Sequence, residues 1–208
     1  MMFDYTATYT DQYQVTMSQV YFHKGMRDET AIFDYFFRKL PFEGGYAVFA
    51  GLEDLLNALE NFRFDQKDLA FLEKEGMDRD FLDYLEDFRF TGNIYAAKEG
   101  DLIFPNRPVL SVEAPIIEAQ LLETLTLNTL NYQSLIATKA SRMRLSAGNR
   151  KLVDFGLRRA PEPADIRPAA QPSSADLTPP AMCAADAITA SRYRAPWPTH
   201  SCSATIRR

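Results

Sequence analysis

Two adjacent arginines, Arg158 and Arg159, follow Gly156 at the end of a predicted strand within residues 154–160 (Asp-Phe-Gly-Leu-Arg-Arg-Ala). A guanidinium presents a planar fork of hydrogen-bond donors that matches a carboxylate or a phosphate. The pair therefore indicates an anion site. On residue types alone, a solvated pair of surface arginines is the more common outcome.

Other familiar catalytic motifs are missing. The glycines at 44, 45 and 51 fit neither the G-x-x-x-x-G-K-[ST] phosphate loop nor the G-x-G-x-x-G dinucleotide motif. The chain has two histidines, His23 and His200. Two are too few for a histidine metal site, and no Ser-His-Asp set is apparent. We expect His23, which lies in a predicted helix, at the surface.

Charge and composition exclude several classes of protein. The net charge of −5 gives no electrostatic support for a nucleic-acid partner. No window approaches the roughly 18 apolar residues that a membrane span needs, so no membrane partner is expected. The N-terminus has neither the basic nor the apolar region of a signal peptide. Both cysteines, Cys183 and Cys202, lie in the last 48 residues, so no disulfide framework is expected and the protein is predicted to be cytoplasmic.

The spacing of apolar residues predicts an α/β order followed by a small sheet. Thr10 and Asp11 can cap the first helix. Helices are predicted over residues 12–24, 52–62, 65–76, 80–88 and 116–146. Strands are predicted over residues 31–38, 46–50, 94–97, 101–104, 109–113 and 151–155, with a turn at 41–45. The last helix and strand indicate the start of a βα barrel, in which functional groups lie at the C-terminal ends of the strands.

Four further motifs give residues 154–160 a context. They are Thr-Asp-Gln-Tyr-Gln-Val-Thr-Met at 10–17, Phe-Arg-Lys-Leu-Pro-Phe at 37–42, Tyr-Ala-Val-Phe-Ala-Gly-Leu at 46–52 and Leu-Asn-Tyr-Gln-Ser-Leu-Ile-Ala-Thr-Lys at 130–139. In order and spacing, all five motifs resemble nicotinate phosphoribosyltransferase, and the resemblance covers residues 5–160. The pairing of the first and last motifs disfavours a nicotinamide- or quinolinate-specific relative.

The resemblance implies a fold and a reaction. It implies an N-terminal α/β domain with a small β-sheet over residues 1–115, then an irregular βα (TIM-like) barrel beginning at 116–160, in a head-to-tail homodimer. Nicotinate and 5-phosphoribosyl 1-diphosphate would give nicotinate mononucleotide and pyrophosphate, a step of NAD biosynthesis. ATP would drive the reaction through a phosphohistidine, and Mg²⁺ would accompany the polyphosphates.

The resemblance also implies roles for individual residues. Tyr13 would lay its ring against the pyridine, although a core tyrosine is the alternative. Arg158 would hold the nicotinate carboxylate, with Leu157 beside it in the substrate site.

Four further cations are candidates for phosphate binding. Arg38 and Lys39 follow a buried strand and could meet phosphate charge across the dimer interface, while a solvated pair is equally compatible. Lys139 and Arg142 lie one helical turn apart and suggest the same role more weakly.

The composition changes at Ala160. All nine glycines and all fifteen phenylalanines precede this point, whereas eight of the twelve prolines and both cysteines follow it. The resemblance also stops here. The family continues with a Phe-Ile-Gly-Gly-x-Asp-Ala-Thr-Ser-Asn-Val segment and then with Tyr-Gly-Ile-Pro-Val-x-Gly-Thr-Met-Ala-His-Ser. Residues 161–208 are instead predicted to be an anomalous, disordered tail.

A shifted reading frame accounts for this tail. The shifted frame joins the third base of each codon to the first two bases of the next. The Trp197–Pro198 junction must then encode alanine, and residues 188–200 can encode Tyr-Gly-Ile-Pro-Val-Ser-Gly-Thr-Met-Ala-His-Ser. Residues 171–183 can likewise encode Ala-Phe-Ile-Gly-Gly-Phe-Asp-Ala-Thr-Ser-Asn-Val. Both missing segments are therefore available in the other frame.

The shift has a consequence for function. The phosphorylatable histidine belongs to a segment that this chain does not make in frame, and His200 arises from another frame. No catalytic residue is therefore assigned. The alternative to an active enzyme is a truncated, inactive fragment that acts at most as a binding or dimerising remnant.

Overall fold

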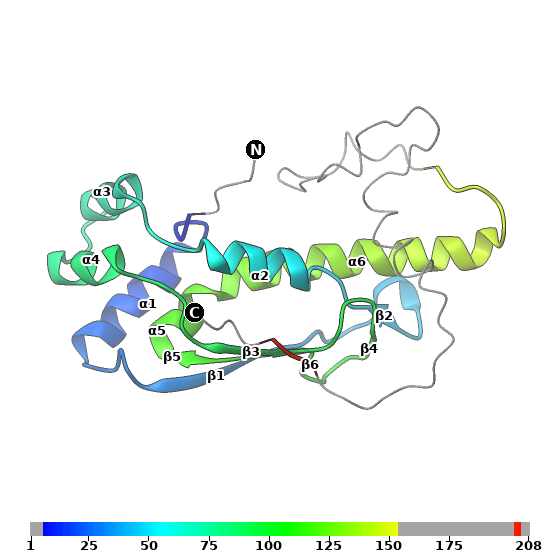
Figure 1. Cartoon of the computed structure of the whole chain (residues 1–208), viewed down its shortest axis with the longest axis horizontal. Helices are drawn as coiled ribbons and strands as arrows, with labels where there is room; N and C mark the ends of the chain where they lie inside the picture. Colours follow the sequence, from blue (N-terminus) through cyan, green and yellow to red (C-terminus); the bar gives the residue numbers. More distant parts are fainter. Residues whose placement is uncertain (1–5, 154–201, 205–208) are drawn as a thin grey trace.

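A computed structural model describes residues 6–153 and 202–204 (Figure 1). The chain begins with α1 (Gln12–His23), β1 (Thr30–Tyr35), the 3-10 turn η1 (Pro41–Glu43), β2 (Ala47–Val48), α2 (Leu52–Glu60), α3 (Gln66–Lys74) and α4 (Arg79–Glu86). It continues with β3 (Asn93–Ala96), β4 (Leu102–Ile103), β5 (Leu110–Pro115), α5 (Ile116–Leu121), α6 (Glu123–Ala147) and β6 (Cys202–Ala204).

The strands form two small antiparallel sheets. The larger sheet has the order β1-β5-β3-β6, and the smaller one pairs β2 with β4. In Figure 1 the larger sheet lies below both α2 and the long helix α6. The predicted mixture of helices with small sheets is therefore confirmed for the described part of the chain.

Local capping chemistry explains where the short helices begin and end. Asp65 and Asp68 form a capping box at the start of α3, in which each carboxylate accepts a backbone N–H from the other end of the turn. Asp78 caps α4 in the simpler way, by accepting from the Asp80 amide. Gly76 follows α3 with a φ of +87°, a conformation that favours glycine.

The structure differs from the prediction in one predicted helix and in one predicted strand. The helical region over 116–146 is interrupted at Leu122, which ends α5 and precedes α6. Residues 151–153 have no strand assignment, and the rest of the strand predicted over 151–155 lies outside the described residues. The predicted start of a barrel therefore stays a prediction.

The tail is described only at β6. These three residues pair with Ala96, Tyr95 and Ile94 of β3, and the predicted disorder of the tail stays a prediction. An edge strand offers unpaired backbone groups, which accounts for the pairing. The remainder of 161–208 lies outside the described residues.

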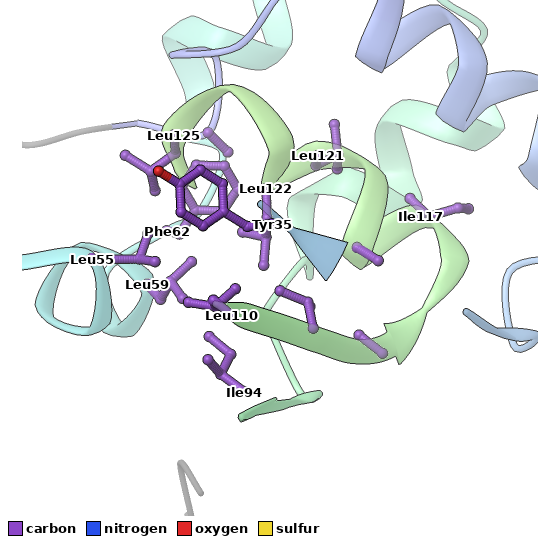
Figure 2. Packing of buried hydrophobic residues seen from close by; sticks show 14 of the residues in the cluster. Tyr35, Leu55, Leu59, Phe62, Ile94, Leu110, Ile117, Leu121, Leu122 and Leu125 are labelled. Atoms are coloured by element: carbon purple, nitrogen blue, oxygen red, sulfur yellow. The ribbon is translucent and has the colours of Figure 1, made fainter. Parts of the chain in front are cut away.

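A buried apolar cluster lies between the helices and the larger sheet. Figure 2 shows the Tyr35 ring of β1 beside Leu125 and Leu122, with Leu110 of β5 and Ile94 of β3 below them. The cluster continues through α5 and α6 without a break at residue 115. The domain boundary placed there stays a prediction. Among the described residues, no helix is both long enough and apolar enough to span a membrane.

Candidate functional site

The first sequence motif lies against the start of α6. The Asp11 amide donates to the Thr124 hydroxyl at 3.3 Å, and that hydroxyl donates to Asp11 Oδ2 at 3.1 Å. Asp11 occupies the N-cap position of α1, but its side chain makes no capping hydrogen bond. The predicted helix cap is therefore a tertiary contact, because the carboxylate faces α6 rather than its own helix.

Tyr13 is held by two neighbouring polar side chains. Its hydroxyl donates to Glu123 Oε1 at 3.2 Å and accepts from Gln14 Nε2 at 2.7 Å. Gln14 Nε2 also donates to Glu123 Oε2 at 2.7 Å, and Gln14 Oε1 accepts from Gln120. The residue as a whole is 49% exposed, so the alternative of a core tyrosine does not hold.

A pocket of about 510 Å³ opens beside this ring. Its lining comes from the start of α1 and from α6 up to Leu135: Asp11, Tyr13, Glu123, Thr124, Leu127, Asn128, Asn131, Tyr132 and Leu135. The lining contains two aromatic rings, two amides and two carboxylates, and no basic side chain. It therefore suits the face of a flat ring, while the charge of an anionic ligand has to be met by residues outside this set.

The electrostatics around Tyr13 follow from these neighbours. Burial and the adjacent Glu123 carboxylate raise the pKa of Tyr13, with a smaller effect from Asp11. The phenol is therefore neutral at pH 7 and acts as a hydrogen-bond donor to the carboxylate. The arrangement offers an oriented aromatic face with two carboxylates beside it.

The predicted phosphate ligands lie apart from this pocket. Arg38 and Lys39 are exposed after β1, and the Arg38 guanidinium lies 5.7 Å from the centre of the Phe36 ring. Lys139 is exposed on α6. Within the described ranges, none of these three forms an ion pair with a carboxylate. They stay candidates for an anion.

Arg142 has a different environment. Its guanidinium donates to the Phe42 carbonyl at 2.9 Å and lies 5.8 Å from the centre of the Phe42 ring. Phe42 and Glu43 have φ values of +59° and +51°, which non-glycine residues rarely adopt. Arg142 thus holds a strained turn, and a phosphate would have to compete with that contact.

Several predicted residues cannot be placed. Arg158, Leu157 and His200 lie outside the described residues. His23 is exposed, as predicted. Across 6–153 and 202–204, no group of three or more His, Cys, Asp or Glu side chains could hold a metal ion.

Sequence reasoning missed Gln14 and Glu123 as functional candidates. Gln14 belonged to a recognised motif but received no role, and Glu123 belonged to none. The two are 109 residues apart in the chain, so no periodic pattern links them. Only the packing of α1 against the α5–α6 region brings them together.

Comparisons with known proteins cover this same part of the chain. The family model described as the nicotinate phosphoribosyltransferase (NAPRTase) N-terminal domain matches residues 8–131. Nicotinate phosphoribosyltransferase of Bacillus subtilis is 51% identical over 160 residues, which are 76% of this chain and 33% of that protein. The enzyme of the same name from Caenorhabditis elegans is 45% identical over 159 residues, 74% of this chain and 28% of that protein.

A solved structure agrees with the sequence comparisons. The crystal structure of human nicotinic acid phosphoribosyltransferase matches with a TM-score of 0.68 and 41% identity, over 74% of this chain and 32% of that chain. The chain therefore spans about a third of the length of the relatives it matches.

Proposed function

The chain belongs to the nicotinate phosphoribosyltransferase family, and we propose that the intact enzyme joins nicotinate to the ribosyl carbon of 5-phosphoribosyl 1-diphosphate. The pyridine nitrogen forms a bond to C1 of the ribose as the bond from C1 to the pyrophosphate oxygen breaks. Pyrophosphate leaves with the bonding electrons, and the ring nitrogen becomes a pyridinium. The products are nicotinate mononucleotide and pyrophosphate.

The observation that carries the proposal is the exposed, oriented ring of Tyr13. It comes from a motif that resembles the family, lies within the matched residues 8–131 and faces a pocket. Positive charge develops on the pyridine ring as the new bond forms. A stacked tyrosine face, which is electron-rich, attracts that charge more strongly than it attracts neutral pyridine. The contact therefore favours the transition state as well as binding.

The anionic parts of the substrates need other residues. The pocket lining has no basic side chain. The family resemblance assigns the carboxylate of nicotinate to Arg158 and places Leu157 in the same substrate site. Arg38, Lys39 and Lys139 are candidates for the phosphates. Arg142 is a weaker one, because its guanidinium already contacts Phe42.

The remaining features of the enzyme are also proposals. We propose ATP as a co-substrate, a homodimer and a cytoplasmic location. The described residues do not fit a resident metal, since Asp11 and Glu123 already accept hydrogen bonds and no group of three ligands exists there. Mg²⁺ is therefore proposed only as the counter-ion of the polyphosphate substrates.

The chain of 208 residues is proposed to be inactive by itself, because its tail after Ala160 is inferred to come from another reading frame. The test is formation of nicotinate mononucleotide from nicotinate, 5-phosphoribosyl 1-diphosphate, ATP and Mg²⁺. We expect no product from the chain as written, and turnover from a gene in which the frame is restored together with its downstream sequence. Product from the 208-residue chain would contradict the frame argument. Resequencing the DNA across codons 155–165 decides independently whether the shift is real.

The same frame-restored enzyme tests the two ligand contacts. Tyr13→Ala is expected to lower kcat/KM for nicotinate. The corresponding loss of transition-state stabilisation is about 1–3 kcal/mol, the scale of a lost aromatic stack. Arg158→Ala is expected to cost more, because a desolvated carboxylate loses its partner. Tyr95→Ala is the matched control, since this tyrosine is 45% exposed on the sheet, away from the pocket. Unchanged kcat/KM in both Tyr13→Ala and Arg158→Ala would refute the assignment.

A further inference from the structure

The hydrogen bonds around Tyr13 form a closed ring of three side chains. Tyr13 donates to one oxygen of Glu123, and Gln14 donates both to the Tyr13 hydroxyl and to the other oxygen of Glu123. Each side chain in the set thus contacts the other two. A rotation of the Tyr13 side chain breaks two hydrogen bonds at once.

One member of this set, Gln14, lies in the protein interior. Gln14 is completely buried, and its amide oxygen accepts from Gln120, which is also buried. With two donated bonds and one accepted bond, the buried amide is satisfied only while Glu123 and Tyr13 keep their positions. Leaving such a group unpaired is costly, so the interior dictates the orientation of an exposed ring.

A second tyrosine, Tyr95, forms a hydrogen bond to a glutamate without a third side chain among those the structure describes. Tyr95 donates to Glu113 Oε2 at 3.1 Å on the outer face of the larger sheet, and its ring is 45% exposed. The residue types, the distance and the exposure resemble those at Tyr13. However, no buried amide joins this pair in the contacts of the described residues, and neither residue lines the pocket. The tyrosine–glutamate hydrogen bond alone therefore does not define the site.

We infer that Glu123 is a positioning residue for the proposed reaction: it links the buried Gln14 amide to the Tyr13 hydroxyl and so fixes the aromatic face against which nicotinate stacks. The identification of nicotinate as the molecule that stacks on Tyr13 rests on the proposed function. The positioning itself rests on the geometry of Tyr13, Gln14 and Glu123. Glu123 needs no contact with the substrate, and no sequence motif marked it.

The first test measures binding of nicotinate to the 208-residue chain by NMR titration. Glu123→Gln leaves one side-chain oxygen in place of two and removes the negative charge, so the residue can no longer accept from both Gln14 and Tyr13, and the Tyr13 hydroxyl loses the carboxylate to which it donates. We expect the Kd to rise about 3- to 10-fold, the equivalent of one lost hydrogen bond. Tyr13→Phe is expected to weaken binding similarly. The double variant is expected to bind no more weakly than the weaker single variant, because both changes remove the same interaction. Glu113→Gln is the matched control and is expected to leave the Kd unchanged.

Additive losses in the double variant would overturn the inference, because Glu123 would then act independently of Tyr13. An unchanged Kd in Glu123→Gln would overturn it as well. If the unmodified chain binds no nicotinate, the proposed use of the Tyr13 face in this chain fails, and the positioning role is decided by a measurement that needs no ligand.

That measurement follows the Tyr13 ring itself. Burial and, after it, the neighbouring carboxylate raise the pKa of Tyr13, so Glu123→Gln is expected to lower this pKa, while the contributions of burial and of Asp11 remain. Ring resonances of Tyr13 are expected to shift toward the averaged values of a freely rotating tyrosine. Glu113→Gln is expected to change the Tyr95 resonances and leave those of Tyr13 in place. Tyr13 signals that stay unchanged in Glu123→Gln would refute the positioning role, whatever the binding data show.

Discussion

The two halves of α6 use polar side chains for different purposes. In the first half, Glu123 and Thr124 reach out to α1, where they hold an exposed tyrosine beside a pocket. From the middle of α6 onward, which we call its second half, Ser134 and Thr138 turn inward to the segment around β2. The Val48 amide donates to Thr138 Oγ1 at 2.8 Å, and the Ala50 amide donates to Ser134 Oγ at 3.1 Å.

The second half thus completes a strand. β2 pairs with β4 through hydrogen bonds on one side, and hydroxyls of α6 take the place of a further strand on the other. Both hydroxyl contacts are buried, so they satisfy backbone groups that water does not reach. Polar residues on one helix therefore build the fold where they face backbone amides, and form a site where they hold a ring that water and ligands can reach.

The largest expected effect on stability comes from a substitution that weakens the packing of both halves of α6. Leu130 lies between them and is fully buried in the main apolar cluster. Leu130→Ala is expected to lower the free energy of unfolding by about 2–5 kcal/mol, since a cavity opens under the middle of the helix. Urea denaturation followed by circular dichroism measures this.

Leu145→Ala on the same helix is the control for that experiment. Leu145 is 72% exposed, and we expect its truncation to change stability by less than about 0.5 kcal/mol. Equal losses in the two variants would mean that the buried seam of α6 is not where the structure places it.

A smaller loss of stability is expected from a substitution that affects the second half of α6 alone. Thr138→Val keeps the shape of the side chain but leaves the buried Val48 amide without an acceptor. We expect a loss of about 1–3 kcal/mol in the free energy of unfolding, with no direct effect on the Tyr13 contacts. Thr16→Val is the control, because the Thr16 hydroxyl only bonds the Gln12 carbonyl of its own exposed turn. A Thr138→Val variant as stable as the control would remove the strand-like role assigned to the second half.

The turn held by Arg142 supplies a third test of the second half. A Cβ at Gly44 would overlap Arg142 Nη1, whereas a Cβ at Gly45 would meet nothing within 4 Å. Because the end of a long side chain can move away, Gly44→Ala is expected to cost less than about 1 kcal/mol. Displacing the guanidinium removes its contact with Phe42. We therefore expect faster amide hydrogen exchange across the turn in Gly44→Ala and not in Gly45→Ala; matching exchange rates in the two variants would contradict the role of Arg142.

The sequence predicted the local features of this fold well. The cap at Asp65, the stop at Gly76 and the helices on either side follow from short-range chemistry and apolar spacing, and all are found. The break at Leu122 was missed because buried leucines continue the helical spacing through it.

The candidate site was only half predictable. A motif identified Tyr13, but its orientation depends on Glu123, which lies 110 residues away in the chain. Asp11 was expected to cap a helix and instead bonds Thr124. Residue type limits which hydrogen bonds are possible, and tertiary packing selects among them, so a single sequence does not reveal the choice.

The smallest expected effect concerns Glu99, whose carboxylate accepts from the Gly51 and Leu52 amides at the start of α2. The side chain as a whole is exposed, but its carboxylate lies against the backbone. This local burial raises the pKa of Glu99 although the two amides act in the opposite direction. A raised pKa means that the folded state holds the proton more tightly than the unfolded state.

The stability contributed by Glu99 is therefore complete below the ordinary glutamate pKa of about 4.3, and it is lost as the pH rises through the folded-state value. Glu99→Gln removes this dependence, and it also replaces one acceptor by an amide that cannot accept from Leu52. We expect the profile of unfolding free energy between about pH 4 and pH 7 to fall less steeply in the variant than in the parent chain. Glu60→Gln, an exposed change at the other end of α2, controls for the loss of one negative charge. Parallel profiles for the parent chain and Glu99→Gln would contradict this prediction. They would show that the two α2 amides stabilise the ionised carboxylate enough to cancel the effect of its burial on the pKa.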